Sequence, residues 1–285
     1  MRVLLVPNTA NPGAVSAAAE LSTWLTGQGI EPVLANADAA GSGLPDLGVA
    51  PTDLADVRLC VALGGDGTIL KAFHLLESAE TPLLGVKFGR LGFLSGATPD
   101  RMREAVGAAL AGEARIERRS TLEASVVMGG RAVGSYRALN EVVVSRGASS
   151  RVIALDLAID GHPIMRTPAD GVVVATATGS TAYALSAGGP VVAPAFGGMV
   201  VVAVAPHTLA SRAIVTDPSD VIEITLPDTS RSDACVVVDG DPTPCRRSLD
   251  RVTIKRGETD ALLVKLDGRH FYDTLESEFF GGGGA

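Results

Sequence analysis

The order of apolar segments along the 285-residue chain changes near Arg118. Before that residue, short apolar runs alternate with stretches of helical periodicity. This alternation predicts a parallel sheet with helices packed on its faces. We expect strands at 2–6, 31–35, 58–63 and 83–86, helices at 14–26 and 69–77, and a surface loop at 37–51.

After Arg118, strand-like segments follow one another without long helices between them. We therefore expect an α/β domain at residues 1–118 and a mainly β, sandwich-like domain at residues 119–261. Asp160-Gly161, between two of these segments, is typical of a hairpin turn. Residues 281–285 are expected to form a flexible tail. The expected strands of the second domain are 121–128, 131–136, 141–145, 152–159, 171–175, 200–205, 221–226, 234–238 and 251–255.

The charge balance and the apolar pattern argue against several classes of protein. The chain has 24 Lys and Arg against 32 Asp and Glu, a net charge of −8, whereas a general electrostatic binder of nucleic acid would carry the opposite sign. Its N-terminal apolar run is too short for a signal peptide. Glycines and prolines interrupt the charge-free stretch between Asp170 and Arg212 before it could form a membrane helix of roughly 20 residues. The three cysteines are too dispersed for a zinc site. We therefore expect a cytoplasmic protein whose partners include neither nucleic acid nor a membrane.

The strongest chemical signal is the run Gly64-Gly65-Asp66-Gly67-Thr68, between an apolar strand and a helix. Glycines there would let the backbone take positive φ and approach a ligand closely. The amides of such a turn, at the start of a helix, favour phosphate. A carboxylate in an anion-binding turn needs a purpose, such as accepting a hydroxyl proton. The alternative is that Asp66 caps the helix, and placement alone leaves both interpretations open.

Two further segments carry polar groups next to expected strands. The run from Thr176 to Tyr183, continuing to Ser186, offers hydroxyls and a glycine that suit a nucleotide base or a polyphosphate. Taken alone, this run is more typical of a Ser- and Thr-rich turn with Tyr183 in the core. Asn140-Glu141, at the start of a strand, could bind paired ribose hydroxyls, although Asn at such a position more often shapes a turn.

Together these three segments, in this order and spacing, resemble the NAD kinase family over residues 58–240. The glycine turn alone is shared with lipid kinases, whereas the Thr-Gly-Ser-Thr-Ala-Tyr run with the Asn-Glu pair is far more specific. The resemblance implies transfer of a phosphoryl group to the adenosine-ribose 2′-hydroxyl of NAD, giving NADP. It also implies a homodimer or homotetramer, and a chain end, residues 262–280, that returns to the first domain.

The resemblance also implies roles for individual residues, carried over by position. Asp66 is the catalytic proton acceptor, and both Asp66 and Gly67 contact NAD. Asn140 and Glu141 bind the dinucleotide ribose, and Asp170 holds the nicotinamide end. The adenine region is lined by Phe93, Thr181, Ala182, Tyr183 and Ser186.

The donor site is less defined. The backbone of the turn would hold the donor phosphates, and a magnesium ion carried by those phosphates, rather than by the protein, would shield their charge. ATP, another nucleotide or polyphosphate could be the donor. The residues expected near it are Gly64, Gly65, Thr68, Lys71 and Arg151.

The chain departs from the family pattern at Lys87, often Asn in relatives, and at Pro168 and Asp241. Two alternatives stay open. A lipid or diacylglycerol kinase uses the same glycine turn but needs an apolar acceptor cleft. A non-catalytic dinucleotide sensor would bind NAD without turnover, and the intact Asp66 argues against it.

Overall fold

The computed structural model describes residues 1–54, 56–76, 80–89, 92–147, 152–227, 234–244, 248–266 and 270–281. The chain divides into two compact units. The first comprises Met1–Arg118 and Asp260–Ala285, and the second comprises Arg119–Thr259. The first unit is therefore built from two stretches of chain that are separated in sequence by the whole of the second.

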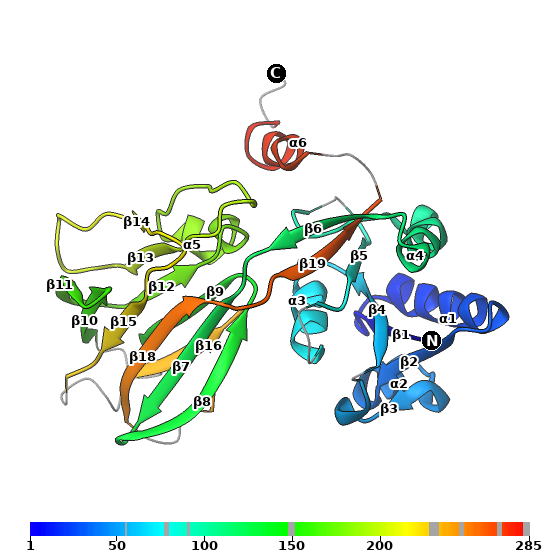
Figure 1. Ribbon diagram of the computed structural model, residues 1–285, viewed down its shortest axis with the longest axis horizontal. Helices are drawn as coiled ribbons and strands as arrows, with labels where there is room; N and C mark the ends of the chain where they lie inside the picture. Colours follow the sequence, from blue (N-terminus) through cyan, green and yellow to red (C-terminus); the bar gives the residue numbers. More distant parts are fainter. Residues whose placement is uncertain are drawn as a thin grey trace. The chain divides into compact units, whose positions relative to one another are not determined.

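The first unit contains a seven-stranded sheet in the order β3-β2-β1-β4-β5-β19-β6 (Figure 1). The pairs β1–β2, β1–β4, β2–β3, β4–β5 and β5–β19 are parallel, which confirms the expected sheet type. The sheet includes β19, from the chain end, for which the sequence pattern gave no strand. The bounds are β1 Arg2–Pro7, β2 Glu31–Ala35, β3 Gly48–Val49, β4 Val57–Gly64, β5 Leu83–Lys87, β6 Arg115–Arg119 and β19 Ala261–Lys265.

Helices cover both faces of this sheet. Helices α1 and α4 pack on one face and share its apolar core, whereas α3 packs on the other face against β4 and β5 (Figure 1). The expected loop at 37–51 is wrong, because this stretch holds α2, a 3-10 turn at Pro45–Leu47 and β3. Its high Gly and Asp content hid these short elements. The bounds are α1 Pro12–Gly27, α2 Asn36–Gly41, α3 Asp66–Leu75 and α4 Met102–Ala111.

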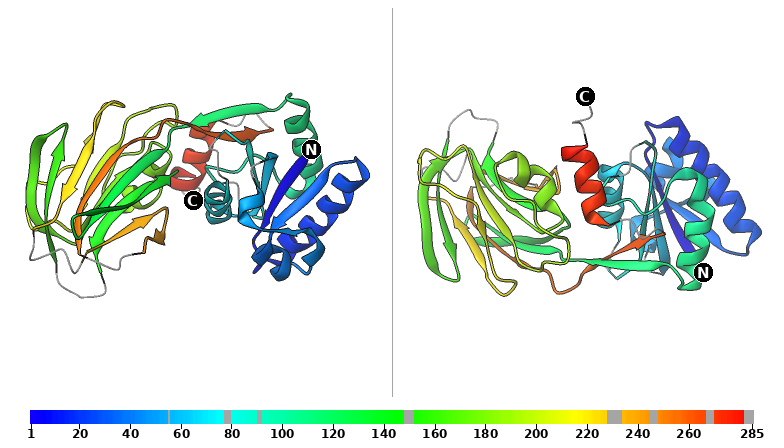
Figure 2. Two further views of the ribbon diagram at one scale, coloured as in Figure 1. Left: turned by 60° about the horizontal axis from the view of Figure 1, so that its bottom comes forward. Right: turned by 90° about the horizontal axis from the view of Figure 1, so that it is seen from above.

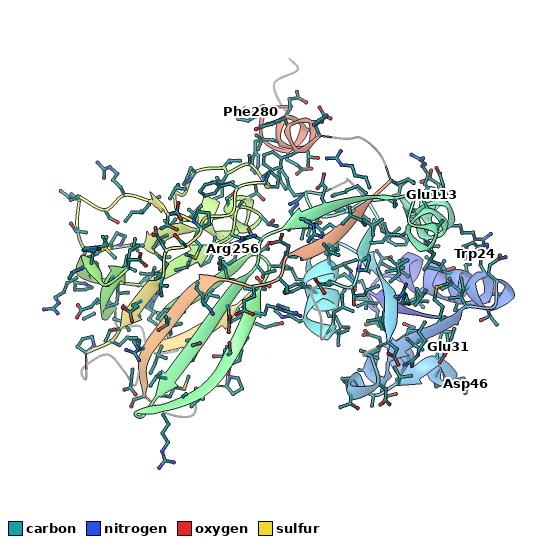
Figure 3. All side chains as sticks on the ribbon, viewed as in Figure 1. Trp24, Glu31, Asp46, Glu113, Arg256 and Phe280 are labelled. Carbon is teal, nitrogen blue, oxygen red and sulfur yellow. The ribbon has the colours of Figure 1, made fainter. Side chains whose placement is uncertain are left out.

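Helix α1 shows how local sequence sets an element. The Asn11 side chain accepts hydrogen bonds from the Gly13 and Ala14 amides at 2.9 and 3.3 Å, and a proline occupies the first helical position. Leu21 and Leu25, one turn apart, are fully buried against the sheet. Figure 3 labels Trp24 on the same helix, where it packs partly buried at the edge of this core.

The second unit is built of antiparallel sheets (Figure 2). There are two of them, each six-stranded, in the orders β11-β10-β15-β18-β7-β8 and β14-β13-β12-β9-β16-β17. One apolar core contains residues of both sheets, so the expected sandwich is confirmed. The bounds are β7 Leu122–Met128, β8 Arg131–Ala138, β9 Glu141–Arg146, β10 Ile153–Ile159, β11 His162–Ala169, β12 Gly171–Ala175, β13 Val200–Val204, β14 Ile214–Val215, β15 Ile222–Thr225, β16 Ala234–Val238, β17 Asp241–Pro242 and β18 Leu249–Arg256.

The hairpin prediction also holds. Asp160 and Gly161 link β10 to β11 with φ of 49° and 73°, the backbone that a two-residue primed turn requires. Among the described residues, no helix combines the length and the apolar character needed to cross a membrane.

In the sheet that contains β12, the central strands β9, β12 and β13 are largely buried on both faces. Its outer face carries a separate apolar cluster that includes Val143, Val173 and Val200, and Ala184 of helix α5 (Tyr183–Ser186) covers it. All five residues of β12 are therefore buried, and the strand reads as a continuous apolar run. The polar segment that contains α5 is in this way fixed to the sheet.

The chain end forms helix α6 (Phe271–Leu275) and a following helical turn (Glu276–Phe280). Phe280, labelled in Figure 3, is 72% exposed. Of the tail expected at 281–285, Gly281 follows this turn, and residues 282–285 lie outside the described residues.

Candidate functional site

The glycine turn lies at the carboxyl end of β4. The strand ends at Gly64, Gly65 precedes the helix, and Asp66 is the first residue of α3. The Gly64 position has no room for a side chain, because a Cβ there would lie 2.3 Å from Thr68 Oγ1. The prediction of positive φ is wrong for this turn, since none of its three glycines takes that backbone. Close packing explains the glycine at position 64, whereas the space beside Gly65 and Gly67 is open.

Asp66 does not cap the helix. Gly65 is the capping residue, and α3 has no side-chain cap. The Asp66 side chain is 36% exposed, and its buried Oδ1 atom has no hydrogen-bond partner. The Lys87 Nζ atom lies 3.8 Å from that oxygen. The Asp66 Oδ1 atom can therefore still accept a hydrogen bond, and the Lys87 ammonium lies beside it.

Lys87 reaches Asp66 because β4 and β5 run in parallel and Gly64 pairs with Lys87 at the end of both strands. Gly92 closes over the two side chains. A Cβ at Gly92 would lie 2.4 Å from Asp66 Oδ2 and 2.5 Å from Lys87 Nζ. The sequence pattern did not assign Lys87 to the site, and its place at a strand end next to the glycine turn was the signal that could have found it.

Phe93 follows directly after Gly92. Its ring centroid lies 5.6 Å from that of Phe271 and 6.1 Å from that of Phe279, both of which belong to the helical chain end. The Lys265 ammonium donates hydrogen bonds to the carbonyls of Phe93, Leu94 and Ser95 at 3.4, 3.2 and 2.7 Å. The chain end therefore holds the segment that lies against Asp66.

Lys71 forms an ion pair within the first unit. Its ammonium pairs with the carboxylate of Asp38 on α2, whose side chain is only 4% exposed. The pair joins α3 to α2. Arg151, the other basic residue expected near the donor, lies outside the described residues.

The Lys71–Asp38 pair gives a stability prediction. Lys71→Met leaves a buried carboxylate without its cation, and we expect the free energy of unfolding to fall by about 1–3 kcal/mol. Urea denaturation measures the loss. Lys255→Met is the matched control, because Lys255 pairs with Glu123 in an exposed position and should change stability by at most about 1 kcal/mol. Equal stabilities of the two variants would contradict the prediction. The KM for ATP, measured on the same samples, reports any contact of Lys71 with the donor.

In the second unit, Asn140 and Glu141 are 9% and 7% exposed at the start of β9. The Thr176 amide donates to the Asn140 carbonyl at 2.8 Å, and the Thr176 hydroxyl donates to the Leu139 carbonyl at 2.7 Å. Gly179 packs against the same peptide, because a Cβ at Gly179 would lie 2.1 Å from the Asn140 carbonyl oxygen. The hydroxyl-rich segment and the Asn-Glu pair thus form one compact structure.

Glu141 has an unusual electrostatic environment. Burial and, to a smaller extent, the negative charge of Asp239 raise the pKa of its carboxyl to about 7, against the lowering effect of a hydrogen bond from the Tyr183 backbone. Its buried Oε2 atom has no hydrogen-bond partner. Near neutral pH this carboxyl is therefore divided between its ionised and protonated forms.

Most hydroxyls of the segment are used locally. The Thr176 hydroxyl accepts a hydrogen bond from the Gly179 amide at 3.0 Å. The Ser180 hydroxyl donates to the Ala177 carbonyl and accepts from the Val192 amide. The Thr181 hydroxyl donates to the Thr178 carbonyl at 3.2 Å. The interpretation as a Ser- and Thr-rich turn is thus correct for these three side chains. Its second half is wrong, because Tyr183 is 43% exposed rather than part of the core. Ala182 is half-buried and Ser186 is exposed beside Tyr183.

Asp170 lies away from this cluster. It forms an ion pair with Arg146 at 2.8 Å, at the end of the β9–β12 pair where Gly171 faces Ser145. Glu141 faces Ala175 at the other end. Four residues of strand at roughly 3.4 Å each separate the two ends. The structure therefore brings Asn140, Glu141 and Tyr183 together but leaves Asp170 at a distance from them.

Comparison with known proteins places both units in a class of two-domain kinases. Residues 3–114 match the family model described as the ATP-NAD kinase N-terminal domain, and residues 139–266 match the ATP-NAD kinase C-terminal domain. The two matches together take in most of the chain, including the glycine turn and the Asn-Glu pair.

Curated relatives agree over nearly the full length. The chain is 40% identical to an NAD kinase of Thiobacillus denitrificans, covering 98% of this chain and 96% of that protein, and 36% identical to one of Desulforamulus reducens, covering 96% and 95%. The chain belongs to the NAD kinase family.

Solved structures show the same similarity. The crystal structure of yeast NADH kinase complexed with NADH matches with a TM-score of 0.88 and 25% identity, covering 100% of this chain and 89% of that one. An NAD kinase from Archaeoglobus fulgidus in complex with ATP matches with a TM-score of 0.75 and 28% identity, covering 96% and 97%.

Proposed function

We propose that Asp66 accepts the proton of the adenosine-ribose 2′-hydroxyl of NAD while that oxygen attacks the γ-phosphorus of ATP. The chain is an enzyme with NAD kinase activity, and ATP and NAD are its substrates. The bond between the 2′-oxygen and the γ-phosphorus forms, the bond to the β–γ bridging oxygen breaks, and ADP leaves. The proton passes to an Asp66 carboxylate oxygen.

The observation that carries this proposal is the state of the Asp66 carboxylate. It stands in a glycine turn at the carboxyl edge of a parallel sheet, where ligands of such sheets bind. It neither caps α3 nor uses its buried oxygen in a hydrogen bond. A partly exposed carboxylate with free lone pairs can take a proton from a hydroxyl that comes within hydrogen-bond distance.

Lys87 supports the same role. Donor phosphates and a carboxylate repel each other, and the Lys87 ammonium at 3.8 Å offsets the charge of Asp66. The open space at Gly65 and Gly67 lets phosphate oxygens approach the amides at the start of α3, with Gly64 and Thr68 forming the closed side of the turn.

Magnesium is proposed as part of the donor. Phosphate oxygens are good ligands for Mg²⁺, and the ion neutralises charge as the phosphoryl group is transferred. Within the residues that the structure describes, no three His, Cys, Asp or Glu side chains are gathered as metal ligands.

NAD is proposed to use the cluster of the second unit. The Glu141 carboxyl, with its unpartnered oxygen, suits a pair of ribose hydroxyls, and the Asn140 amide can donate and accept beside it. The exposed ring of Tyr183 offers an apolar face to a base, with Thr181, Ala182 and Ser186 around it. Gly67 and Phe93 are proposed contacts on the first unit, and Asp170 a contact to the nicotinamide end. The cytoplasmic location and the homodimer or homotetramer stay predictions.

An assay of NADP formation tests the proposal. The protein is incubated with NAD and ATP, with and without Mg²⁺, and the product is measured with a dehydrogenase that accepts only NADP. We expect product with both substrates and Mg²⁺, and none when EDTA removes the ion. Parallel samples with other nucleoside triphosphates, polyphosphate or NADH define the donor and acceptor range. Phosphate appearing at another hydroxyl would contradict the assignment of the 2′ position.

The pKa of Glu141 gives a pH prediction. Below about pH 7 its carboxyl is protonated and can accept fewer hydrogen bonds from ribose hydroxyls. We therefore expect kcat/KM for NAD to rise with pH through a limb near 7. In Glu141→Gln, which cannot titrate, that limb should vanish and the KM for NAD should increase. A profile that is identical in both proteins would assign the limb to another group.

A further inference from the structure

Asp239 lies in a tight turn about 100 residues along the chain from the Asn-Glu pair. It joins β16 to β17 together with Gly240, and the two residues have φ of 48° and 90°. Positive φ at a non-glycine residue is uncommon, and Asp is one of the few residue types that accept it. The side chain is buried, with 8% of the residue exposed.

The Asp239 carboxylate accepts hydrogen bonds from three successive backbone amides. Its Oδ2 atom lies 2.8 Å from the Leu139 nitrogen, and its Oδ1 atom lies 2.7 and 3.0 Å from the nitrogens of Asn140 and Glu141. The Asp239 amide donates in return to the Glu141 carbonyl at 3.0 Å. Hydrogen bonds of amides to a carboxylate are short and strong compared with those to a neutral acceptor.

These hydrogen bonds, together with those of Thr176, hold the backbone of the segment that carries the Asn-Glu pair. Thr176 already binds the carbonyls of Leu139 and Asn140, so Asp239 and Thr176 hold the donors and the acceptors of the same short segment. With the backbone held in this way, the protein sets the points at which the Asn140 and Glu141 side chains leave the main chain before any ligand arrives. Preorganisation of this kind lowers the entropic cost of binding.

Asp239 also influences the charge of Glu141. Its carboxylate is the second cause, after burial, of the raised Glu141 pKa. A variant without the Asp239 charge should therefore ionise Glu141 at a lower pH. This effect provides a measurable signal that a purely structural role would not produce.

We propose that Asp239 is a positioning residue for NAD, which fixes the Asn140–Glu141 pair through its three amide bonds and does not itself touch the substrate. The inference rests on the proposed role of that pair in binding NAD. A clear consequence is that the loss of Asp239 affects the NAD side of the reaction and leaves the ATP side unchanged.

The test uses Asp239→Asn in the full-length chain, with NAD and MgATP as substrates. Asn also accepts positive φ, so the turn can form, while its amide provides only one acceptor oxygen for three donors. We expect the KM for NAD to rise by at least about tenfold, with kcat and the KM for ATP within about threefold of the wild type. The limb of the pH profile should move to lower pH. Asp241→Asn, two residues on and exposed, is the matched control and should resemble the wild type.

A double-mutant comparison shows whether Asp239 acts through Glu141. In the Glu141→Gln background, the added effect of Asp239→Asn on the KM for NAD should shrink, because the partner that it positions is already impaired. Asp239→Ser is the second variant if Asp239→Asn does not fold. A failure of both variants to fold, or an unchanged KM for NAD and pH profile in a folded variant, would overturn the inference. Absence of NADP formation by the wild type would instead refute the proposed function.

Discussion

Asp66→Asn is expected to lower kcat for NADP formation by about 10²–10⁴-fold, the usual cost of removing a general base. Asn has nearly the same shape as Asp, so the glycine turn and its contacts should persist. The amide cannot accept the proton of the 2′-hydroxyl, and the attacking oxygen loses its activation. Affinity for NAD, measured by calorimetry without ATP, should stay within about threefold of the wild type.

The matched control for this variant is Asp46→Asn, on an exposed 3-10 turn of the same unit. It makes the same chemical change and should retain full turnover. Near-normal turnover of Asp66→Asn would remove the carboxylate from the mechanism. A loss of NAD affinity that parallels the loss of kcat would instead identify Asp66 as a binding residue.

Gly179→Ala is expected to destabilise the protein by about 1–3 kcal/mol and to weaken NAD binding at the same time. The new methyl group would meet the Asn140 carbonyl oxygen at 2.1 Å and its carbon at 2.5 Å, both parts of the backbone. Since a backbone clash cannot be relieved by a rotamer change, the peptide before Glu141 must shift. Urea denaturation reports the stability, and the KM for NAD reports the displacement of the Asn-Glu pair.

Gly107→Ala is the control, and its expected change in stability has the opposite sign. Gly107 lies within helix α4, and an added Cβ there would contact nothing within 4 Å. Alanine in a helix interior is favoured over glycine by roughly 0.5–1 kcal/mol, so this variant should be slightly more stable with unchanged kinetics. Equal stability and equal KM for NAD in the two alanine variants would show that the backbone at Gly179 can yield to the added methyl group.

Local patterns in the sequence predict much of the fold. The alternation of strands and helices before Arg118 gives the parallel sheet, and the run of strands after it gives the sandwich, because both depend on periodicities of a few residues. β19 could not be found in this way. Its pairing of Leu263 with Leu83 is parallel and long-range, and a five-residue strand with four apolar residues does not reveal its partner.

The candidate site shows the same division. The glycine turn and the Asn-Glu pair are visible as motifs, since each is contiguous in sequence. Asp239 carries no such signal, because its three hydrogen bonds reach residues that only the β9–β16 pairing brings near. Lys71 carries no signal of its ion pair either, because Asp38 lies on α2, 33 residues away in sequence.

The place of β19 in the first sheet has a consequence for synthesis of the protein. This strand lies between β5 and β6, yet it is synthesised only after the entire second unit. The β-rich unit is a continuous stretch that can fold while translation proceeds, whereas the α/β unit must wait, with the flank of β5 uncovered, for its last strand. The parallel sheet that carries Asp66 is thus closed by a strand that follows the whole second unit in synthesis.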